Sequence, residues 1–378
     1  LPRVTITGRI AFGFLLSEGG VHMRIPAEIE YVLRRLEACG HEAYLVGGCV
    51  RDALRGAAPD DFDVTTSALP DETERVFAAD RVLETGLKHG TVTVLHGGMP
   101  VEITTYRTEG AYSDGRHPDS VSFTRSLAED LCRRDFTVNA MAMDVHGSVV
   151  DLYGGREDLA AGCLRAVGNP ATRFTEDALR ILRAFRFAAK LGFAIEPATL
   201  AAAAELAPRL RLVSRERIFV ELCKLVCAPY AATVLAQMAD GGVFDCIFDA
   251  PRLNRRALAY LGTLPARAEI RLAALFYGDA AAETHIASLK PSTAFLRRAA
   301  GILRAAAPTS DAPSLRRFVY ANGADVARAA VLVLAGEQEM LADLPARLEA
   351  LLTREDCFTL RDLKVSGEDA RAAGFTGA

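Results

Sequence analysis

No part of this 378-residue sequence contains the roughly 20 consecutive apolar residues that a membrane-spanning helix requires. None of its eight cysteines forms a Cys-x-x-Cys pair, which argues against a zinc site. The net charge is only −4, so the chain is not a protein that is basic over its whole surface. These absences predict a protein of the reducing cytoplasm, with no membrane or protein partner implied.

The composition indicates a folded protein of two to four domains, since half of the residues are hydrophobic and a quarter are charged. The basic residues are mostly arginine, which favours bidentate contacts with phosphates and base edges. A GC-rich genome would produce the same arginine bias, so the bias alone does not establish nucleic-acid binding.

The pattern along the chain divides it into a mixed α/β part and a helical part. Residues 1–22 lack an initiating Met and are interpreted as an extension, because Met23 precedes a clean amphipathic pattern. Up to about residue 160 short strands alternate with helices; after that the strands are expected to stop. The expected helices are 26–39, 50–54, 70–77 and 174–191, and the expected strands are 44–46, 62–65, 92–95 and 101–106.

The most informative feature is the pair Asp61 and Asp63, which follows the glycines Gly47 and Gly48. Residues i and i+2 of a strand point to one face, so the two carboxylates converge and repel unless a cation lies between them. Mg²⁺ prefers carboxylate and phosphate oxygens, and a glycine turn lets the backbone approach a phosphate. Alone, an Asp-x-Asp pair is usually unrelated to metal and a Gly-Gly pair is usually a simple turn.

Two further clusters combine charged and polar side chains. The first runs from Arg133 to Ala140 (Arg-Arg-Asp-Phe-Thr-Val-Asn-Ala) and indicates either ribose and triphosphate contacts or a surface ion-pair cluster. The second runs from Glu176 to Arg183 (Glu-Asp-Ala-Leu-Arg-Ile-Leu-Arg). A carboxylate and a guanidinium held on one helix could imitate a base-pairing partner, although most such patterns are ordinary salt bridges.

Together with Asp151, Gly154-Gly155 and the Glu216-Arg217-Ile218 segment, these motifs resemble the bacterial tRNA nucleotidyltransferases, or CCA-adding enzymes, a class II family that includes poly(A) polymerases. The resemblance is dense from about residue 41 to 225. It implies an α+β fold: a polymerase-β-like nucleotidyltransferase head with a mixed sheet, followed by an all-helical neck, body and tail. The implied parts are 1–22 (extension), 23–161 (head), 162–220 (neck), 221–300 (body) and 301–378 (tail).

The family activity is the addition of C, C and A to the 3′ end of tRNA from CTP and ATP, without a template. By resemblance, Asp61 and Asp63 would hold two Mg²⁺ ions about 4 Å apart. Glu102 is the candidate third carboxylate, with a sheet-edge glutamate as the alternative. The residues expected to hold the nucleotide are Gly47, Gly48, Arg51, Arg134, Asp135 and Asn139, with Asp177 and Arg180 reading the base and Arg183 supporting that pair.

Two segments favour the full CCA-adding subtype. The polar segment 107–118 resembles the flexible loop used in switching from C to A addition, and residues 85–91 resemble the CCA-adding group. Residues 360–369 resemble the start of a tail motif. The alternatives are a CC-adding or A-adding enzyme, a bacterial poly(A) polymerase, or a non-catalytic RNA-binding relative.

Overall fold

The computed structural model describes residues 25–59, 61–87, 90–110, 121–354, 358 and 367–374. The chain forms two compact units, one of residues up to Arg180 together with Ala194–Ala203, and one of Ile181–Phe193 together with the chain from Ala204 onward. The predicted extension at residues 1–22 lies outside the described residues.

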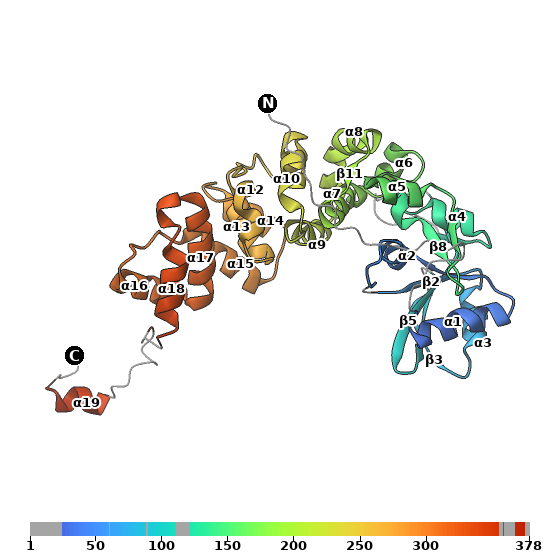
Figure 1. Cartoon of the computed structure of the whole chain (residues 1–378), viewed down its shortest axis with the longest axis horizontal. Helices are drawn as coiled ribbons and strands as arrows, with labels where there is room; N and C mark the ends of the chain where they lie inside the picture. Colours follow the sequence, from blue (N-terminus) through green and yellow to red (C-terminus); the bar gives the residue numbers. More distant parts are fainter. Residues whose placement is uncertain are drawn as a thin grey trace. The chain divides into compact units, whose positions relative to one another are not determined.

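The first unit is built on a mixed sheet of seven strands in the order β3-β4-β5-β2-β1-β8-β9 (Figure 1). Its only parallel neighbours are β2 and β5; the other pairs are antiparallel. These strands are β1 (Ala43–Val46), β2 (Asp63–Thr66), β3 (Arg81–Gly86), β4 (Thr91–His96), β5 (Met99–Thr105), β8 (Met141–Met143) and β9 (Val149–Asp151). The predicted mixed sheet is therefore confirmed, with strand ends shifted by one or two residues.

Helices cover both faces of this sheet. The larger core buries the apolar stripe of α1 (Ala27–Ala38) with side chains of α2 (Gly48–Leu54), α3 (Pro70–Val76) and the strands. On the other face, α4 (Leu127–Cys132) packs Leu131 against Val46 and Ala142. Since burial of apolar area is the main stabilising term, these two cores hold the strand ends that carry the polar motifs.

The rest of the first unit comprises a strand ribbon and the segments after the sheet. The ribbon is β6 (Arg107–Glu109) with β7 (Val121–Phe123). The other elements are η2 (Thr137–Asn139), α5 (Gly155–Ala161), β10 (Cys163–Leu164), α6 (Pro170–Glu176), β11 (Ala194–Ile195) and the start of α8 (Pro197–Leu206). The prediction that strands stop near residue 160 is wrong, because β10 and β11 form a short parallel pair.

The predicted continuous helix 174–191 is also interrupted. α6 ends at Glu176, and α7 (Leu179–Leu191) begins after Asp177, whose backbone is extended (φ −136°, ψ 105°). Aspartate competes with helical backbone bonding and favours helix starts, which explains why a periodic pattern breaks at this residue.

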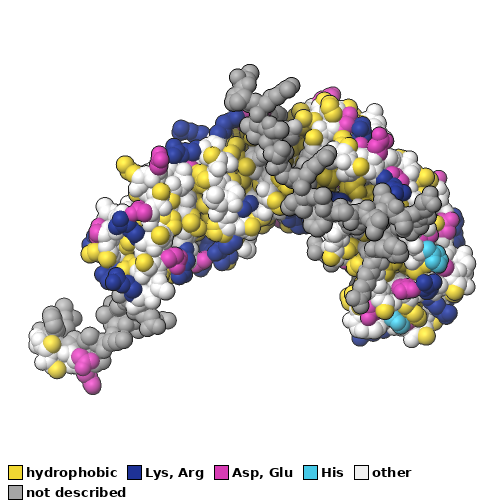
Figure 2. Space-filling view, in the orientation of Figure 1, with side chains coloured by type: hydrophobic (Ala, Val, Ile, Leu, Met, Phe, Trp, Pro, Cys, Tyr) yellow, Lys and Arg dark blue, Asp and Glu magenta, His cyan; other side chains and the backbone are white. Residues whose placement is uncertain are grey.

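The second unit is helical in its described residues, beginning with the remainder of α7. Its other elements are η3 (Ala207–Leu212), α9 (Arg215–Val226), α10 (Ala231–Asp240), α11 (Val243–Ile247), α12 (Ala257–Tyr260), η4 (Leu261–Thr263), α13 (Ala268–Leu275), α14 (Ala282–Ser288), α15 (Thr293–Arg304), α16 (Ala312–Asn322), α17 (Ala324–Glu337), η5 (Glu339–Leu341), α18 (Leu344–Leu352) and α19 (Gly367–Ala372). On the face drawn in Figure 2, basic and acidic side chains of this unit are interspersed.

Within the described part of the chain, no single helix is long and apolar enough to cross a membrane; α16 and α17 meet that criterion only when taken together across a bend of 118°. The predicted division into neck, body and tail by residue number stays a prediction.

Candidate active site

The glycine turn lies between a carboxylate and a guanidinium. β1 ends at Val46, which pairs with Asp63 of β2, and Gly47 then adopts φ 78° and ψ −131° before α2 begins. A Cβ built on Gly47 would lie 3.4 Å from Arg134 Nη1 and 3.4 Å from Asp63 Oδ2. This backbone conformation favours glycine, and the turn brings bare backbone next to Asp63 and Arg134.

The carboxylates of Asp61, Asp63 and Glu102 lie near one another at this end of the sheet. In the parallel pair β2·β5, Val64 lies opposite Ile103, so the preceding residues Asp63 and Glu102 are neighbours on adjacent strands. Asp61 comes just before β2 and accepts the N–H of Phe62 at 2.9 Å. The structure thus brings Glu102 beside the predicted Asp61–Asp63 pair.

The electrostatics of Asp63 reflect this crowding. Its pKa is raised, first because surrounding protein atoms desolvate the carboxyl and next because the Asp61 carboxylate repels its charge. Arg134 opposes the shift and Glu102 adds to it. Since a bound cation would relieve this repulsion, the site has the charge that a divalent metal requires.

The donor set fits a hard divalent cation, of which Mg²⁺ is one. Among the described residues, no three His, Cys, Asp or Glu side chains are grouped as a protein-only metal cage. Mg²⁺ does not need such a cage, because it keeps water and takes one or two carboxylates together with substrate phosphates. Asp61 and Asp63 supply oxygen ligands of that kind.

A buried carboxylate, Asp130, organises the arginine pair of the second motif. Asp130 is fully buried, and its Oδ1 accepts from Arg133 Nε at 3.0 Å and Nη2 at 2.8 Å, while its Oδ2 accepts from Arg134 Nη2 at 3.4 Å. The Nε of Arg134 is buried and has no hydrogen-bond partner. Asp130 therefore holds Arg134 through Nη2, while Nη1 of the same guanidinium lies next to the Gly47 turn.

The remaining polar residues of that motif, Asp135 and Asn139, form a hydrogen-bond network with Arg51. Asp135 Oδ1 accepts from the Phe136 N–H at 2.9 Å and from Asn139 Nδ2 at 3.2 Å. Asn139 Oδ1 in turn accepts from Arg51 Nη1 at 2.6 Å. Arg51 also donates to both carboxylate oxygens of Asp52, at 2.9 and 2.8 Å. Arg51 thus joins the glycine turn to the second motif, and its predicted contact with phosphate stays a prediction.

The third motif is a helix start rather than a helix interior. Asp177 Oδ1 accepts the Leu179 N–H at 3.0 Å, which caps α7. Arg180, 9% exposed, donates to Glu176 and to the carbonyl oxygens of Arg173 (3.2 Å) and Arg133 (3.0 Å). Arg180 therefore ties the third motif to the second.

An open cavity of about 190 Å³ lies where these two motifs meet. It is lined by Thr108, Glu129, Cys132, Arg133, Arg173 and Glu176. Because Thr108 belongs to β6, the cavity also borders the ribbon formed by β6 and β7.

Other predicted features have different outcomes. Arg183 lies in the second unit with its guanidinium 5.3 Å from the Phe187 ring centre, and its support of base reading stays a prediction. Glu216, Arg217 and Ile218 lie in the first turn and the start of the second turn of α9. Most of the loop 107–118, Lys88, His89 and most of the tail motif 360–369 lie outside the described residues.

Sequence reasoning missed two buried acids. Asp130 stands three and four residues before Arg133 and Arg134, a helical spacing that could have identified it. Asp158 is 6% exposed and accepts a hydrogen bond from Thr137 Oγ1 at 2.7 Å. The two residues are 21 positions apart, so no local spacing in the sequence indicates their contact.

Comparisons with known proteins match this arrangement. Residues 43–165 match the family model described as "Poly A polymerase head domain", and residues 192–255 match "Probable RNA and SrmB- binding site of polymerase A". A "CCA-adding enzyme" of Streptococcus pneumoniae is 50% identical over 229 residues, covering 60% of this chain and 57% of the relative. One of Streptococcus gordonii is 48% identical over 228 residues, with the same coverage.

A solved structure extends the similarity over most of the chain. The "CCA-adding enzyme" of Bacillus stearothermophilus in complex with CTP superposes with a TM-score of 0.76 at 34% identity, covering 94% of this chain and 90% of that one. The matched region of the two streptococcal relatives spans only 57% of their length.

Proposed function

We propose that this chain, which belongs to the family of CCA-adding enzymes, adds C, C and A to the 3′ end of tRNA from CTP and ATP without a template. The observation that carries the proposal is the cluster of Asp61, Asp63 and Glu102 beside the Gly47 turn and Arg134. Carboxylates, bare backbone and a guanidinium at one strand end are what a metal-bound triphosphate needs.

The reaction is attack by the RNA 3′-oxygen on the α-phosphorus of the nucleotide, with departure of pyrophosphate. When bound by Asp61 and Asp63, Mg²⁺ would supply charge neutralisation for the attacking and leaving oxygens. Glu102 is the candidate third carboxylate of that set. The nucleophile belongs to the substrate, so the protein contributes positioning and electrostatic stabilisation rather than a covalent intermediate.

The nucleotide would lie between the glycine turn and the second motif. Gly47 and Gly48 would offer backbone N–H groups to phosphate oxygens, and Arg134 would donate from Nη1, which lies next to the Gly47 turn. Asp135 and Asn139 would orient the ribose. Their mutual hydrogen bond at 3.2 Å would reduce the side-chain entropy lost on binding.

Base choice would come from Asp177 and Arg180. Cytosine and adenine both present an amino donor next to a ring-nitrogen acceptor, whereas uracil and guanine present a carbonyl acceptor next to a ring N–H donor. A carboxylate beside a guanidinium complements the first pattern and opposes the second. The bonds that hold Arg180 to Arg133 and Arg173 support this reading, because a fixed donor discriminates better than a mobile one.

The test is extension of a tRNA that ends at the discriminator base. With both nucleotides the expected product is longer by CCA, and with CTP alone it is longer by CC. The Asp61→Ala and Asp63→Ala variants should no longer extend tRNA in the presence of Mg²⁺, although both should still bind it. Extension by both variants would contradict the assignment of the site.

One observation favours a second candidate, since the matching head model carries a poly(A) polymerase name. Long runs of A from ATP alone would support that activity instead. Addition of CC without A, or of A only to a tRNA that already ends in CC, would indicate a partial enzyme. If the protein binds tRNA but incorporates no nucleotide under any condition, it is a non-catalytic RNA-binding relative.

A further inference from the structure

We propose that Asp158 is a positioning residue for nucleotide binding: through Thr137 it sets the turn that presents Asp135 and Asn139. The inference rests on the proposed function in one respect, namely that these two residues contact the nucleotide. Asp158 itself lies on α5, where it contacts neither Arg51 nor the carboxylate cluster through any hydrogen bond in the structure described.

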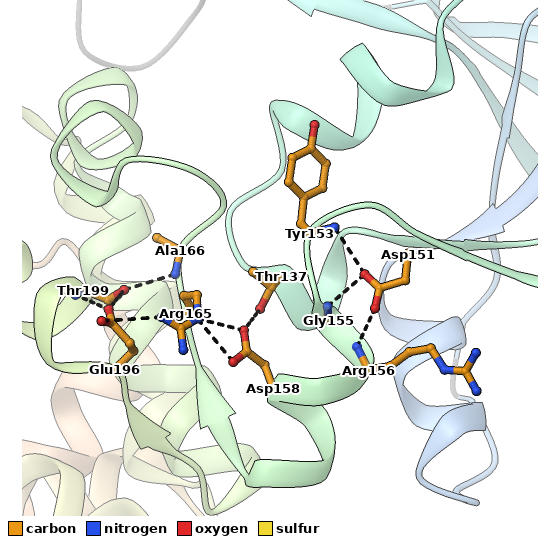
Figure 3. Close-up of polar contacts among 10 residues, drawn as sticks. All are labelled: Thr137, Asp151, Tyr153, Gly155, Arg156, Asp158, Arg165, Ala166, Glu196 and Thr199. Carbon is orange, nitrogen blue, oxygen red and sulfur yellow. Dashed lines mark hydrogen bonds and ion pairs between the residues drawn. The ribbon is translucent and has the colours of Figure 1, made fainter.

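Three contacts hold Thr137 in place, of which Figure 3 shows the first, with Asp158. Its hydroxyl donates to Asp158 Oδ2 at 2.7 Å, and its backbone N–H donates to the carbonyl oxygen of Arg165 at 2.9 Å. The third contact is with Gly155, which packs so closely on the Thr137 carbonyl oxygen that a Cβ at this position would overlap it. The first residue of α5 is therefore in direct contact with Thr137.

The turn at Thr137 sets the positions of the Asp135 and Asn139 side chains. Ala140 donates its N–H to the Thr137 carbonyl at 3.0 Å, closing η2, and Asn139 lies inside that turn. On the preceding side, the Asp135 carbonyl accepts the Val167 N–H at 3.1 Å. A rotation of Thr137 would therefore move Asn139, and with it the 2.6 Å bond to Arg51.

Asp158 is itself fixed from the opposite side. Arg165 Nε lies 3.2 Å from its Oδ1 and 3.1 Å from its Oδ2, and Arg165 Nη1 lies 3.6 Å from Glu196 Oε1. Glu196 Oε2 accepts from the N–H and hydroxyl of Thr199 at 2.7 and 2.8 Å, and Thr199 Oγ1 accepts the Ala166 N–H at 3.1 Å. Figure 3 shows this chain of contacts running from Thr137 to the start of α8.

The chemistry favours a positioning role over simple stabilisation. A buried carboxylate is costly unless its oxygens are satisfied, and an apolar residue would fill the same space at least as well for stability. What a charged acceptor adds is a strong, directional bond to one hydroxyl rotamer of Thr137. A small displacement of a substrate-holding group has a large effect on binding and rate, so that fixed rotamer matters to the site.

The experiment compares Thr137→Val, Thr137→Ser, Asp158→Asn and the Thr137→Val/Asp158→Asn double variant of the full chain. The dissociation constant for CTP is measured without RNA, and KM and kcat are measured with tRNA. We expect Thr137→Val and Asp158→Asn each to raise the dissociation constant and KM about tenfold, with a smaller fall in kcat. Thr137→Ser keeps the hydroxyl and should bind CTP within about twofold of wild type.

Two features of this design separate positioning from folding. The double variant should bind no more weakly than the worse single variant, because both changes break one bond. Tyr31→Phe is the matched control: it also removes one hydroxyl bond to a carboxylate, from Tyr31 to Asp80 at 3.0 Å, on α1 away from the motif. It should lower the melting temperature and leave CTP binding unchanged.

The inference is overturned if Thr137→Val and Asp158→Asn lower the melting temperature as Tyr31→Phe does and leave CTP binding within about twofold. If Asp158→Asn does not fold, Thr137→Val decides alone, since valine has the shape of threonine. If the variants bind CTP more weakly but the wild-type protein never extends tRNA, the positioning role is supported and the proposed function is rejected. If the wild-type protein extends tRNA and the variants bind CTP normally, the proposed function is supported and the positioning role is rejected.

Discussion

The Asp177 carboxylate accepts the backbone N–H of Leu179 at 3.0 Å and so caps the helix that carries Arg180. One side chain therefore has two roles that can be separated: a structural cap and the proposed acceptor for the base. Asparagine caps a helix as well as aspartate, whereas alanine does not.

Substitutions of Asp177 should separate these roles. We expect Asp177→Ala to lower the free energy of unfolding by about 1 kcal/mol and Asp177→Asn to leave it nearly unchanged. Both should reduce the preference for CTP over UTP, because both remove the carboxylate. Urea unfolding and relative kcat/KM values measure the two effects; an Asp177→Asn variant with normal nucleotide choice would make Asp177 a cap alone.

Arg180 should control nucleotide choice more than nucleotide affinity. Arg180→Ala removes the donor beside Asp177 and also leaves the carbonyl oxygens of Arg133 and Arg173 without its bonds. We expect a loss of stability of about 1–3 kcal/mol and a fall in CTP-over-UTP discrimination that exceeds the rise in KM for CTP. Arg180→Lys, which keeps the charge but not the planar fork, should fall between. Unchanged discrimination among the four nucleotides would reject the side-chain template.

Removal of the Asp63 charge should abolish activity without destabilising the fold. Because the pKa of Asp63 is raised in the folded state, that state binds the proton more tightly than the unfolded chain, and stability falls as pH rises above about 4 through the folded pKa. Asp63→Asn should therefore be as stable as wild type, or more stable, at pH 7, with a rate reduced by about 10³-fold or more.

Magnesium provides an independent readout at the same residue. Added Mg²⁺ should raise the melting temperature of the wild type, since it binds the folded state, and should do so much less for Asp63→Asn. Sodium chloride at equal ionic strength is the control for general screening. An equal Mg²⁺ effect on both proteins would place the metal elsewhere.

The two adjacent arginines should behave differently. Both contact the buried Asp130, Arg133 at 2.8 Å and Arg134 at 3.4 Å, but only Arg134 has a guanidinium nitrogen, Nη1, next to the Gly47 turn. We expect Arg133→Lys mainly to lower stability and Arg134→Lys mainly to raise KM for CTP, about tenfold. Melting curves and steady-state kinetics of the pair are the measurement, and equal effects of both variants on KM would contradict the assignment.

Glu72 should contribute an acid-sensitive part of stability far from the site. The Arg125 hydrogen bond, with the Leu69 N–H next, lowers the pKa of Glu72 to about 2. The folded state holds the proton less tightly than the unfolded chain, so this stability is present above about pH 4.5 and is lost as pH falls toward 2. Arg125 is half exposed, so we expect about 1 kcal/mol.

Glu72→Gln tests this, because glutamine keeps an acceptor for the Leu69 N–H at the start of α3 but carries no charge. The difference in urea midpoint between wild type and variant should shrink as the pH is lowered from 6 to 2. A difference that stays constant over that range would assign no ionic role to the Glu72–Arg125 pair.

Local patterns predicted the elements that a short stretch of chain can specify. The helix at 27–38, the strand before the Gly47 turn, the helix after it and the strands that carry or follow the Asp61–Asp63 pair all follow from periodicity and turn chemistry, which act over a few residues. The break at Asp177 was not predicted, because an apolar period running through residues 174–191 concealed a capping residue.

The sequence by itself indicated the reaction class, because its motifs, each ambiguous alone, together resemble those of a nucleotidyltransferase family. Only the tertiary structure decided which distant groups support them. Strand pairing brought Glu102 beside Asp63, and helix packing brought Asp158 to Thr137 across 21 positions of chain. Such contacts depend on how strands and helices pack together, and hydrophobic periodicity within a short stretch of sequence carries no information about that packing.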